Sequence, residues 1–186
     1  RALNLAKKRK LIATVPGVEL LQENNVRTGF IEVEEYEAIR RALPEHLREM
    51  ITFFYCTGWR KSEVIGLAWS QVDFENGIVR LEVGTTKNSE GRSFPFSVLP
   101  MLEESLRRQW KRTQALGREK SKMAPRVFWH GLGKPIKDFR GAWKKAVRNA
   151  GCPKKLVHDF RRTAVRNLDR SGVSHSVAMK LVGHRT

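Results

Sequence analysis

The chain has 186 residues, of which 40% are hydrophobic, and its 36 Lys and Arg against 19 Asp and Glu give a formal net charge of +17. This length and apolar content predict one folded domain and exclude a disordered chain. No apolar run is long enough to span a membrane, and the isolated Cys56 and Cys152 lack metal-ligand spacing and fit a reduced intracellular compartment. The excess of positive charge favours a polyanionic partner, most simply nucleic acid.

The first part of the chain has helical patterns divided by Gly and Pro. Residues 1–11 begin inside a helical pattern that Pro16 and Gly17 end, as expected for a piece of a longer protein, and residues 22–28 read as a linker. Two further helices are expected over 33–43 and 44–58, the second beginning at Pro44 and ending at Gly58, and another over 60–69.

The hydrophobic period then changes from helix to strand. The stretch "VDFENGIVRLEV" contains an Asn76-Gly77 turn signal followed by alternating apolar residues, and "TTKNSEGRSFPF" completes a second hairpin in which Pro95 suits an edge strand. We therefore expect an α+β fold, a mainly helical domain with a small three-stranded antiparallel sheet. The later helices are predicted over 98–114, 136–149, 158–170 and 174–182, with a loop over 117–126.

One arginine in "LVHDFRRTAVRNL" is predicted to point into the protein. Phe160, Ala164 and Leu168 recur at helical spacing, and Arg161 falls inside that apolar arc, with His158 one turn earlier on the same side. An unpaired buried charge is very costly, so Arg161 needs either a carboxylate or an anion from outside. A helix start with an arginine and an imidazole suits a phosphate.

The opposite side of the same helix carries Arg162, Arg166 and Arg170. This stripe is either a solvated helix face or a surface that contacts DNA. We take Arg162 and Arg166 as the candidate DNA-binding residues.

The stretch "TGWRKSEVIGL" repeats the pattern of an arginine at a helix start on the packed side. Arg60 and Glu63 share one face, so they form either a structural ion pair or a phosphate site with its orienting carboxylate. Lys87, near the tip of the second hairpin, and His184, after the helix-ending Gly183, read alone as a solvated turn lysine and an ordinary histidine.

Taken in order, these motifs resemble the catalytic domain of tyrosine recombinases, the phage integrase family. "TGWRKSEVIGLAW" is similar to the first arginine box, "HDFRRT" to the second, with Phe160 where leucine is common, and "LVGHRT" to the Leu-x-Gly-His box. The resemblance covers residues 28–186. Residues 1–27 are similar to the end of the DNA-clamping (core-binding) domain and the linker that precede this domain in such proteins.

The resemblance implies a role for each matching residue. Arg60 and Arg161 would hold the nonbridging oxygens of one scissile phosphate, His158 would assist proton transfer, Lys87 would protonate the departing 5′ oxygen, and His184 would donate to a phosphate oxygen. Preorganised cations of this kind stabilise the charge that develops on the equatorial oxygens. Glu63 would orient Arg60.

The implied activity is site-specific recombination of double-stranded DNA, the integration or excision of a phage or mobile element, through a 3′-phosphotyrosyl intermediate. The implied partners are DNA and further copies of the protein in a tetrameric synapse. No cofactor, metal or membrane is expected, and the location would be cytoplasmic, on the bacterial nucleoid when bound to DNA.

The nucleophile of this family has no match in the chain. The family attacks with a tyrosine a few residues beyond the Gly-His box, and the only tyrosines here are Tyr36 and Tyr55, which precede the first arginine box. The resemblance therefore predicts a truncated domain that binds DNA without cleaving it. It also predicts a monomer with an uncovered apolar groove near Val177, Leu181 and Val182.

Three other functions fit the sequence less well. A non-catalytic helical module that binds DNA explains the charge but not the inward-pointing arginines. A metal-dependent nuclease needs clustered ligands, whereas Asp73, Asp138, Asp159 and Asp169 are scattered. A type IB topoisomerase has related chemistry, but the hairpin and the Gly-His box are more similar to an integrase.

Overall fold

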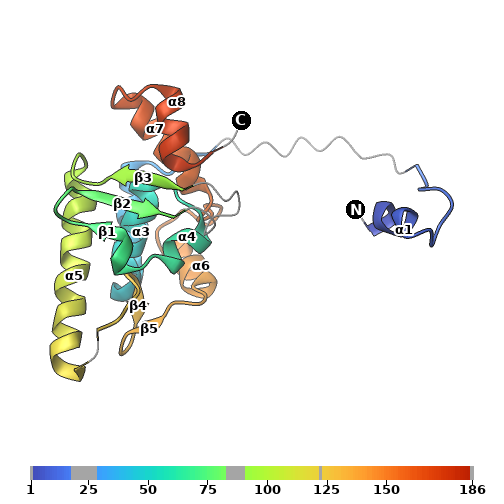
Figure 1. Cartoon of the computed structure of the whole chain (residues 1–186). Helices are drawn as coiled ribbons and strands as arrows, with labels where there is room; N and C mark the ends of the chain where they lie inside the picture. The colour runs from blue at the N-terminus through green and yellow to red at the C-terminus, as the bar shows by residue number, and fades with distance from the viewer. Residues whose placement is uncertain (1, 18–28, 83–90, 122, 185–186) are drawn as a thin grey trace.

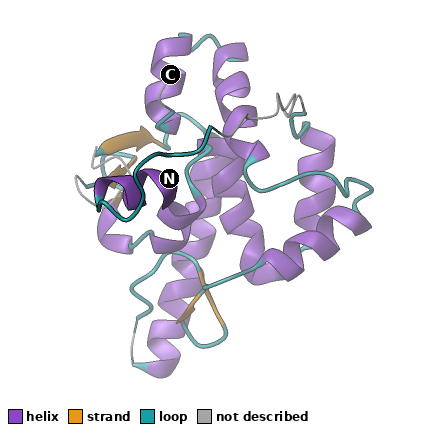
Figure 2. Ribbon diagram, turned by 90° about the vertical axis from the view of Figure 1, so that its right-hand side faces the viewer, coloured by secondary structure: helices purple, strands orange, loops and turns teal. Residues whose placement is uncertain are grey.

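The computed structural model describes residues 2–17, 29–82, 91–121 and 123–184 (Figure 1). Most of the described chain is helical, and two small antiparallel sheets lie at separate places on the helical body (Figures 1 and 2). The elements in chain order are α1 (Ala2–Lys8), α2 (Val33–Ala42), α3 (Glu45–Thr57), α4 (Lys61–Gly66), the 3₁₀ turn η1 (Trp69–Gln71), β1 (Val72–Asp73), β2 (Ile78–Leu81), β3 (Arg92–Pro95), α5 (Pro100–Lys120), β4 (Trp129–His130), β5 (Lys134–Pro135), α6 (Arg140–Asn149), α7 (Asp159–Arg170) and α8 (His175–Val182).

Helix α3 packs at the centre of the domain because it is apolar on most of its sides. It contacts α2, α5 and α7, and Phe54 stacks on Phe160 of α7 with ring centroids 6.2 Å apart. This contact fixes α7 relative to the end of α3, which leads through Gly58 to Arg60. The fully buried apolar residues of α3 include Leu47, Met50, Ile51, Phe53 and Phe54.

The three-stranded sheet has the order β1-β2-β3 and is antiparallel throughout. Gly77 has a positive φ of 65°, as the predicted turn requires, and its carbonyl accepts the N–H of Phe96 at 2.8 Å. Val79 lies opposite Phe94 in the register, and both side chains are buried. The predicted α+β class and the predicted sheet are therefore confirmed.

Several predicted boundaries were wrong. Helix α5 continues to Lys120 through the stretch expected to be a loop, because Leu116 in this last part is buried in a small cluster with Ala124 and Trp129. Helix α6 begins only at Arg140, since a hairpin of β4 and β5 that the sequence did not predict precedes it. Helix α4 ends at Gly66 and is followed by a 3₁₀ turn.

The N-terminal predictions are tested only in part. Helix α1 forms where expected and buries none of its side chains. The predicted linker over 22–28, with the boundary after residue 27, lies outside the described residues.

Helices α7 and α8 pack on each other and make their own small apolar cluster. Val182 is fully buried against Ala164 and Leu168 of α7, so the expected uncovered groove is wrong at this residue. Val177 is 45% exposed, as that prediction expected. Helix α8 also contacts β3, which brings the end of α8 close to the sheet.

Candidate active site

Arg161 points into the protein, as its position in the apolar arc of α7 predicts. It is 5% exposed, and its Nη1 donates to the Gly58 carbonyl at 3.2 Å while its Nη2 donates to the Gly183 carbonyl. Within the part of the chain that the structure describes, no carboxylate forms an ion pair with Arg161. Of the two partners left open by the sequence, the carboxylate is therefore not found, and the buried charge is held by carbonyl oxygens.

The start of α7 is fixed by local hydrogen bonds. Asp159 is buried, and its Oδ2 accepts the N–H of Leu156 at 2.7 Å. Thr163 Oγ1 accepts the N–H of Ile31 at 2.9 Å and donates to the Asp159 carbonyl at 2.9 Å. The first turn of α7 is thus tied both to its own loop and to the segment before α2, which sets the position of Arg161.

Gly58 allows α3 and α7 to approach closely. Its φ is +60°, and a Cβ atom at this position would lie 2.8 Å from the Cβ of Ala164 and 3.1 Å from the Cα of Arg161. Any larger residue would therefore meet both a conformational and a steric penalty. The close approach is what lets Arg161 reach the Gly58 carbonyl.

Arg60 and Glu63 form the predicted pair. Glu63 Oε2 accepts the Arg60 backbone N–H at 2.8 Å, and Glu63 Oε1 accepts from Arg60 Nη1 at 3.1 Å. The side chain of Glu63 is 3% exposed, whereas that of Arg60 is 25% exposed. Arg60 Nη2 also donates to the Gly183 carbonyl at 3.3 Å, the same oxygen that Arg161 contacts.

Arg92 is a member of this cluster that the sequence reasoning missed. It begins β3, donates from Nη2 to Glu63 Oε2, and places its guanidinium 4.8 Å from the centre of the Trp59 ring. The spacing in the sequence could have identified it, because Arg92, Phe94 and Phe96 are every second residue and so share one side of a strand. Both phenylalanines are buried. An arginine on the apolar side of a strand calls for the same argument that identified Arg161.

The three arginines repel one another at short range. Burial, with the neighbouring charges of Arg60 and Arg92, lowers the pKa of Arg161 to about 10. Burial also lowers the pKa of Arg92, although Glu63 opposes that shift. With one carboxylate among them, these guanidinium groups leave an excess of positive charge that an anion would stabilise.

The two histidines lie at the ends of the helices that carry the cluster. His158 is the residue before α7, and His184 follows Gly183, whose φ of +73° ends α8. The turn at His184 is held by its N–H, which donates to the Met179 carbonyl at 2.9 Å, and by Trp59 Nε1, which donates to the Leu181 carbonyl at 3.0 Å. Both histidine side chains are exposed, and Lys87 lies outside the described residues.

The outer arginines of α7 are packed more than a solvated stripe would be. Arg166 and Arg162 lie over the Phe30 ring, with guanidinium carbons 4.2 Å and 5.0 Å from its centre. Arg166 also forms an ion pair with Glu32, in which Nη2 lies 2.9 Å from Oε2. Arg170 is exposed, whereas Arg162 and Arg166 are half-buried.

Neither tyrosine is presented to this cluster as a free phenol. Tyr36 is 3% exposed, its hydroxyl shares a 2.8 Å hydrogen bond with Thr52, and its ring stacks on Tyr55 with centroids 4.1 Å apart. Burial raises the pKa of Tyr36 to about 12 and also raises the pKa of Tyr55. The described residues contain no group of three or more His, Cys, Asp or Glu side chains suited to a metal ion.

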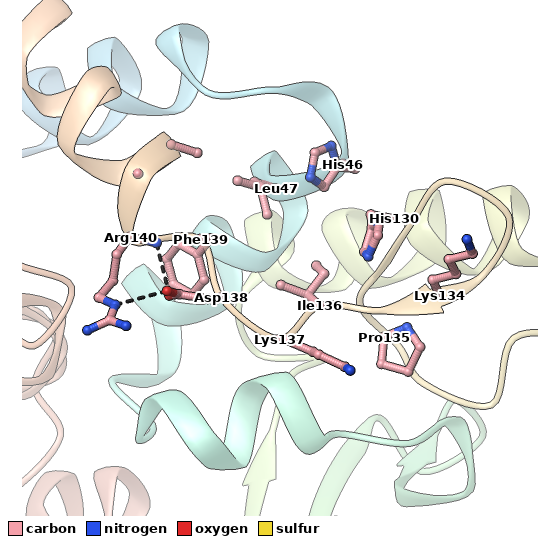
Figure 3. Close-up of a pocket in the computed structure, with 12 residues that line it drawn as sticks. His46, Leu47, His130, Lys134, Pro135, Ile136, Lys137, Asp138, Phe139 and Arg140 are labelled. Carbon is pink, nitrogen blue, oxygen red and sulfur yellow. Dashed lines mark hydrogen bonds and ion pairs between the residues drawn. The ribbon is translucent and has the colours of Figure 1, made fainter.

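A separate basic hollow lies between the start of α3, the β4–β5 hairpin and the start of α6 (Figure 3). Its volume is about 760 Å³, and Lys134, Lys137 and Arg140 contribute positive charge to it. Asp138 pairs there with Arg140 and with Lys61, the residue after Arg60. One ion pair therefore connects the rim of this hollow to the helix that Arg60 begins.

The comparison with protein families supports the resemblance seen in the motifs. The family model described as "Phage integrase family" matches residues 29–186. This match includes both arginine boxes, β3 and the Gly-His turn. Among the described residues, no helix is long and apolar enough to cross a membrane.

Several curated relatives carry recombinase names. The chain is 28% identical over 179 residues to a tyrosine recombinase XerC-like protein of Caldanaerobacter subterraneus subsp. tengcongensis, an alignment that covers 81% of this chain and 46% of that protein. It is 24% identical to the integrase of Salmonella phage P22, an alignment that covers 94% of this chain and 45% of that protein. It is 32% identical to tyrosine recombinase XerD of Corynebacterium glutamicum, and this alignment covers 77% of this chain and 46% of that protein. The chain thus spans about half the length of these relatives.

Solved structures share the fold. A lambda integrase dimer bound to a COC′ core site matches with a TM-score of 0.72 at 19% identity, covering 100% of this chain and 53% of that chain. The lambda integrase catalytic core matches with a TM-score of 0.67 at 19% identity, covering 85% of this chain and 96% of that chain. The expected fold is confirmed by these matches. Because the family model spans most of the chain and the fold agrees with it, the chain belongs to the phage integrase family.

Proposed function

We propose that the protein containing this chain catalyses site-specific recombination of double-stranded DNA, as in the integration or excision of a phage or mobile element. The reaction would be a transesterification through a 3′-phosphotyrosyl intermediate. The names of the curated relatives, tyrosine recombinase and integrase, support this activity. The cluster at the start of α4 and α7 would be the site that holds the scissile phosphate.

The observation that carries the proposal is the convergence of Arg60 and Arg161 on the Gly183 carbonyl. Two guanidinium groups from distant segments already direct donors to one oxygen atom, beside the turn that bears His184. Arginine has a planar fork that matches phosphate oxygens, and a water-poor site strengthens the interaction. A phosphate oxygen near this carbonyl would meet donors from both arginines without a large rearrangement.

The remaining roles follow from the family resemblance. His158 would assist proton transfer to or from the attacking oxygen, Lys87 would protonate the departing 5′ oxygen, and His184 would donate to a phosphate oxygen. Glu63 would hold Arg60, consistent with its hydrogen bonds to both the backbone and the side chain of Arg60. Stabilising the charge of the transition state with fixed donors is the main contribution that such a site makes.

DNA would also contact cationic groups away from the cluster. Arg162 and Arg166 are candidates on α7, and the hollow bordered by Lys137 and Arg140 offers a further basic surface. The similar lambda integrase has been solved as a tetramer bound to a Holliday junction, and we propose that copies of this protein likewise assemble on DNA. The protein would act in the cytoplasm, on the nucleoid when bound.

The test uses the full-length protein with a nicked suicide substrate that traps the covalent complex. Arg161→Ala should reduce the rate of covalent complex formation by ~10²–10³, as the loss of one transition-state donor does elsewhere, with DNA affinity much less affected. Arg170→Ala, on the exposed side of the same helix, is the matched control and should cleave normally. Normal cleavage by Arg161→Ala would refute the proposed site, and DNA binding without any cleavage by the wild-type protein would favour a non-catalytic module.

A further inference from the structure

Arg92 lies between two parts of the site that are far apart in the sequence. On one side it donates to Glu63 Oε2, the carboxylate that holds Arg60. On the other side it lies against the turn at Gly183 that leads to His184. Its side chain is 11% exposed, so the charge is held inside the protein rather than displayed to solvent.

The contact with Glu63 determines how Arg60 can be paired. The two Glu63 oxygens receive three donors, in which Arg92 and the Arg60 backbone N–H share Oε2 while Arg60 Nη1 uses Oε1. Without Arg92, the Arg60 guanidinium could occupy both oxygens in a bidentate pair, which is the arrangement that arginine and carboxylate prefer. With Arg92 on Oε2, Arg60 makes a single side-chain hydrogen bond to Glu63, and its Nη2 is directed to the Gly183 carbonyl instead.

The contact with Gly183 explains why this turn needs a glycine beyond its φ of +73°. A Cβ atom at Gly183 would lie 2.6 Å from Arg92 Cζ. The Arg92 guanidinium thus occupies the space that a side chain at position 183 would need. The same guanidinium packs on the Trp59 ring. The Trp59 indole in turn donates to the Leu181 carbonyl at 3.0 Å, so Arg92 and Trp59 together hold the end of α8.

We propose that Arg92 is a positioning residue that sets Arg60 through Glu63 and the Gly183–His184 turn through direct contact. It would act on the reaction without touching the DNA. The inference rests on the proposed function, because it gives Arg92 a role in presenting the same phosphate donors. It also makes strand β3, and not only the helices, part of the structure that aligns the site.

The experiment measures single-turnover formation of the covalent complex by the full-length protein, together with DNA affinity and thermal stability. Arg92→Met removes the charge and the hydrogen bond to Glu63 but roughly keeps the length of the side chain. It should slow the chemical step by about 10²-fold, as a small misplacement of a reacting group does. DNA affinity should stay within about twofold, because Arg92 would make no phosphate contact. Arg92→Lys keeps the charge without the fork and should slow the same step less.

The matched control is Arg80→Met, on the neighbouring strand β2, where Arg80 lies opposite Ser93 and its side chain is 56% exposed. It should cleave at the wild-type rate. A double-mutant cycle with Glu63→Gln tests whether Arg92 acts through Glu63. If it does, Arg92→Met should slow the chemical step less in the Glu63→Gln background than in the wild type.

The outcomes are distinct. A wild-type rate for Arg92→Met, an equal loss in DNA affinity, or full additivity with Glu63→Gln would overturn the inference. If Arg92→Met does not fold, Arg92→Lys decides, because a slowed step with normal stability supports the proposal and a wild-type step contradicts it. Failure of the wild-type protein to cleave would instead contradict the proposed function.

Discussion

Arg60 and Arg161 donate to the same carbonyl oxygen, that of Gly183. One guanidinium comes from the start of α4 and the other from the start of α7, and neither is fully compensated by a carboxylate, because Glu63 is shared with Arg92. The cluster therefore combines exact placement with uncompensated positive charge. Both properties suit a group that must bind an anion only when the substrate arrives.

Sulfate should stabilise this chain more than chloride does at the same ionic strength. Burial and the cationic neighbours lower the pKa of Arg161 to about 10 in the folded state. Its positive charge therefore destabilises the folded state at pH values below about 10. This destabilisation is relieved as the pH rises through that value. A bound dianion offsets the repulsion, and it stabilises only the folded state. The excess stabilisation should therefore be present at pH 7 and fall as pH rises through about 10.

Thermal unfolding of the 186-residue chain in both salts measures this effect. Arg161→Ala should lose most of the difference between the salts, whereas Arg170→Ala should keep it. An equal response of all three proteins would show that sulfate acts on the general surface rather than at the cluster.

Gly58→Ala should destabilise the fold more than a glycine substitution at positive φ normally does. The new Cβ would meet Ala164 and the backbone of Arg161, in addition to the cost of about 1–2 kcal/mol for a left-handed residue with a side chain. Gly172→Ala is the matched control, because its φ is +86° but nothing lies within 4 Å of a Cβ there. Denaturant unfolding compares the two free energies, and equal losses would contradict the close packing of α3 against α7.

The helical part of the site could be predicted from the sequence because its periodicity is long. Arg161 lies in a helix of 12 residues whose apolar arc is well defined, so its inward direction followed from spacing alone. Glu63 lies in a helix of only 6 residues, but its spacing of three residues from Arg60 was enough to predict that the two pair. These predictions depended on neighbours three and four residues away, which a helix brings together whatever the rest of the fold does.

The parts that were missed depend on contacts between distant segments. Strand β3 has four residues, too few for a periodicity to stand out, and the partners of Arg92 come from α4 and from the turn after α8. The extension of α5 past Gly117 was missed because Leu116 is buried only when Ala124 and Trp129 return to it. The catalytic roles proposed for Arg60, Lys87, His158, Arg161 and His184 stay predictions.

DNA binding by this chain should be weak, electrostatic and strongly dependent on salt. The formal charge of +17 predicts that the logarithm of the DNA association constant decreases steeply with the logarithm of the salt concentration. The magnitude of this slope decreases by about 0.9 for each phosphate contact that is lost. Lys137→Ala, at the basic hollow, should reduce the slope by roughly that amount. Arg118→Ala, near the exposed end of α5, is the control with the same loss of charge and should change the slope little. Tight binding that is unchanged between low and high salt would contradict the prediction.

The 186-residue chain should form no covalent link to DNA, although it carries Arg60, His158, Arg161 and His184. Its two tyrosines are Tyr36 and Tyr55, and the Tyr36 hydroxyl is buried and bonded to Thr52, while burial raises the pKa of both phenols. Positioned donors without a nucleophile leave only slow attack by water. Incubation with nicked half-site DNA and denaturing electrophoresis gives the readout. A covalent band that disappears in Tyr55→Phe or Tyr36→Phe would identify that phenol as the nucleophile, and the assignment of the site would then be wrong.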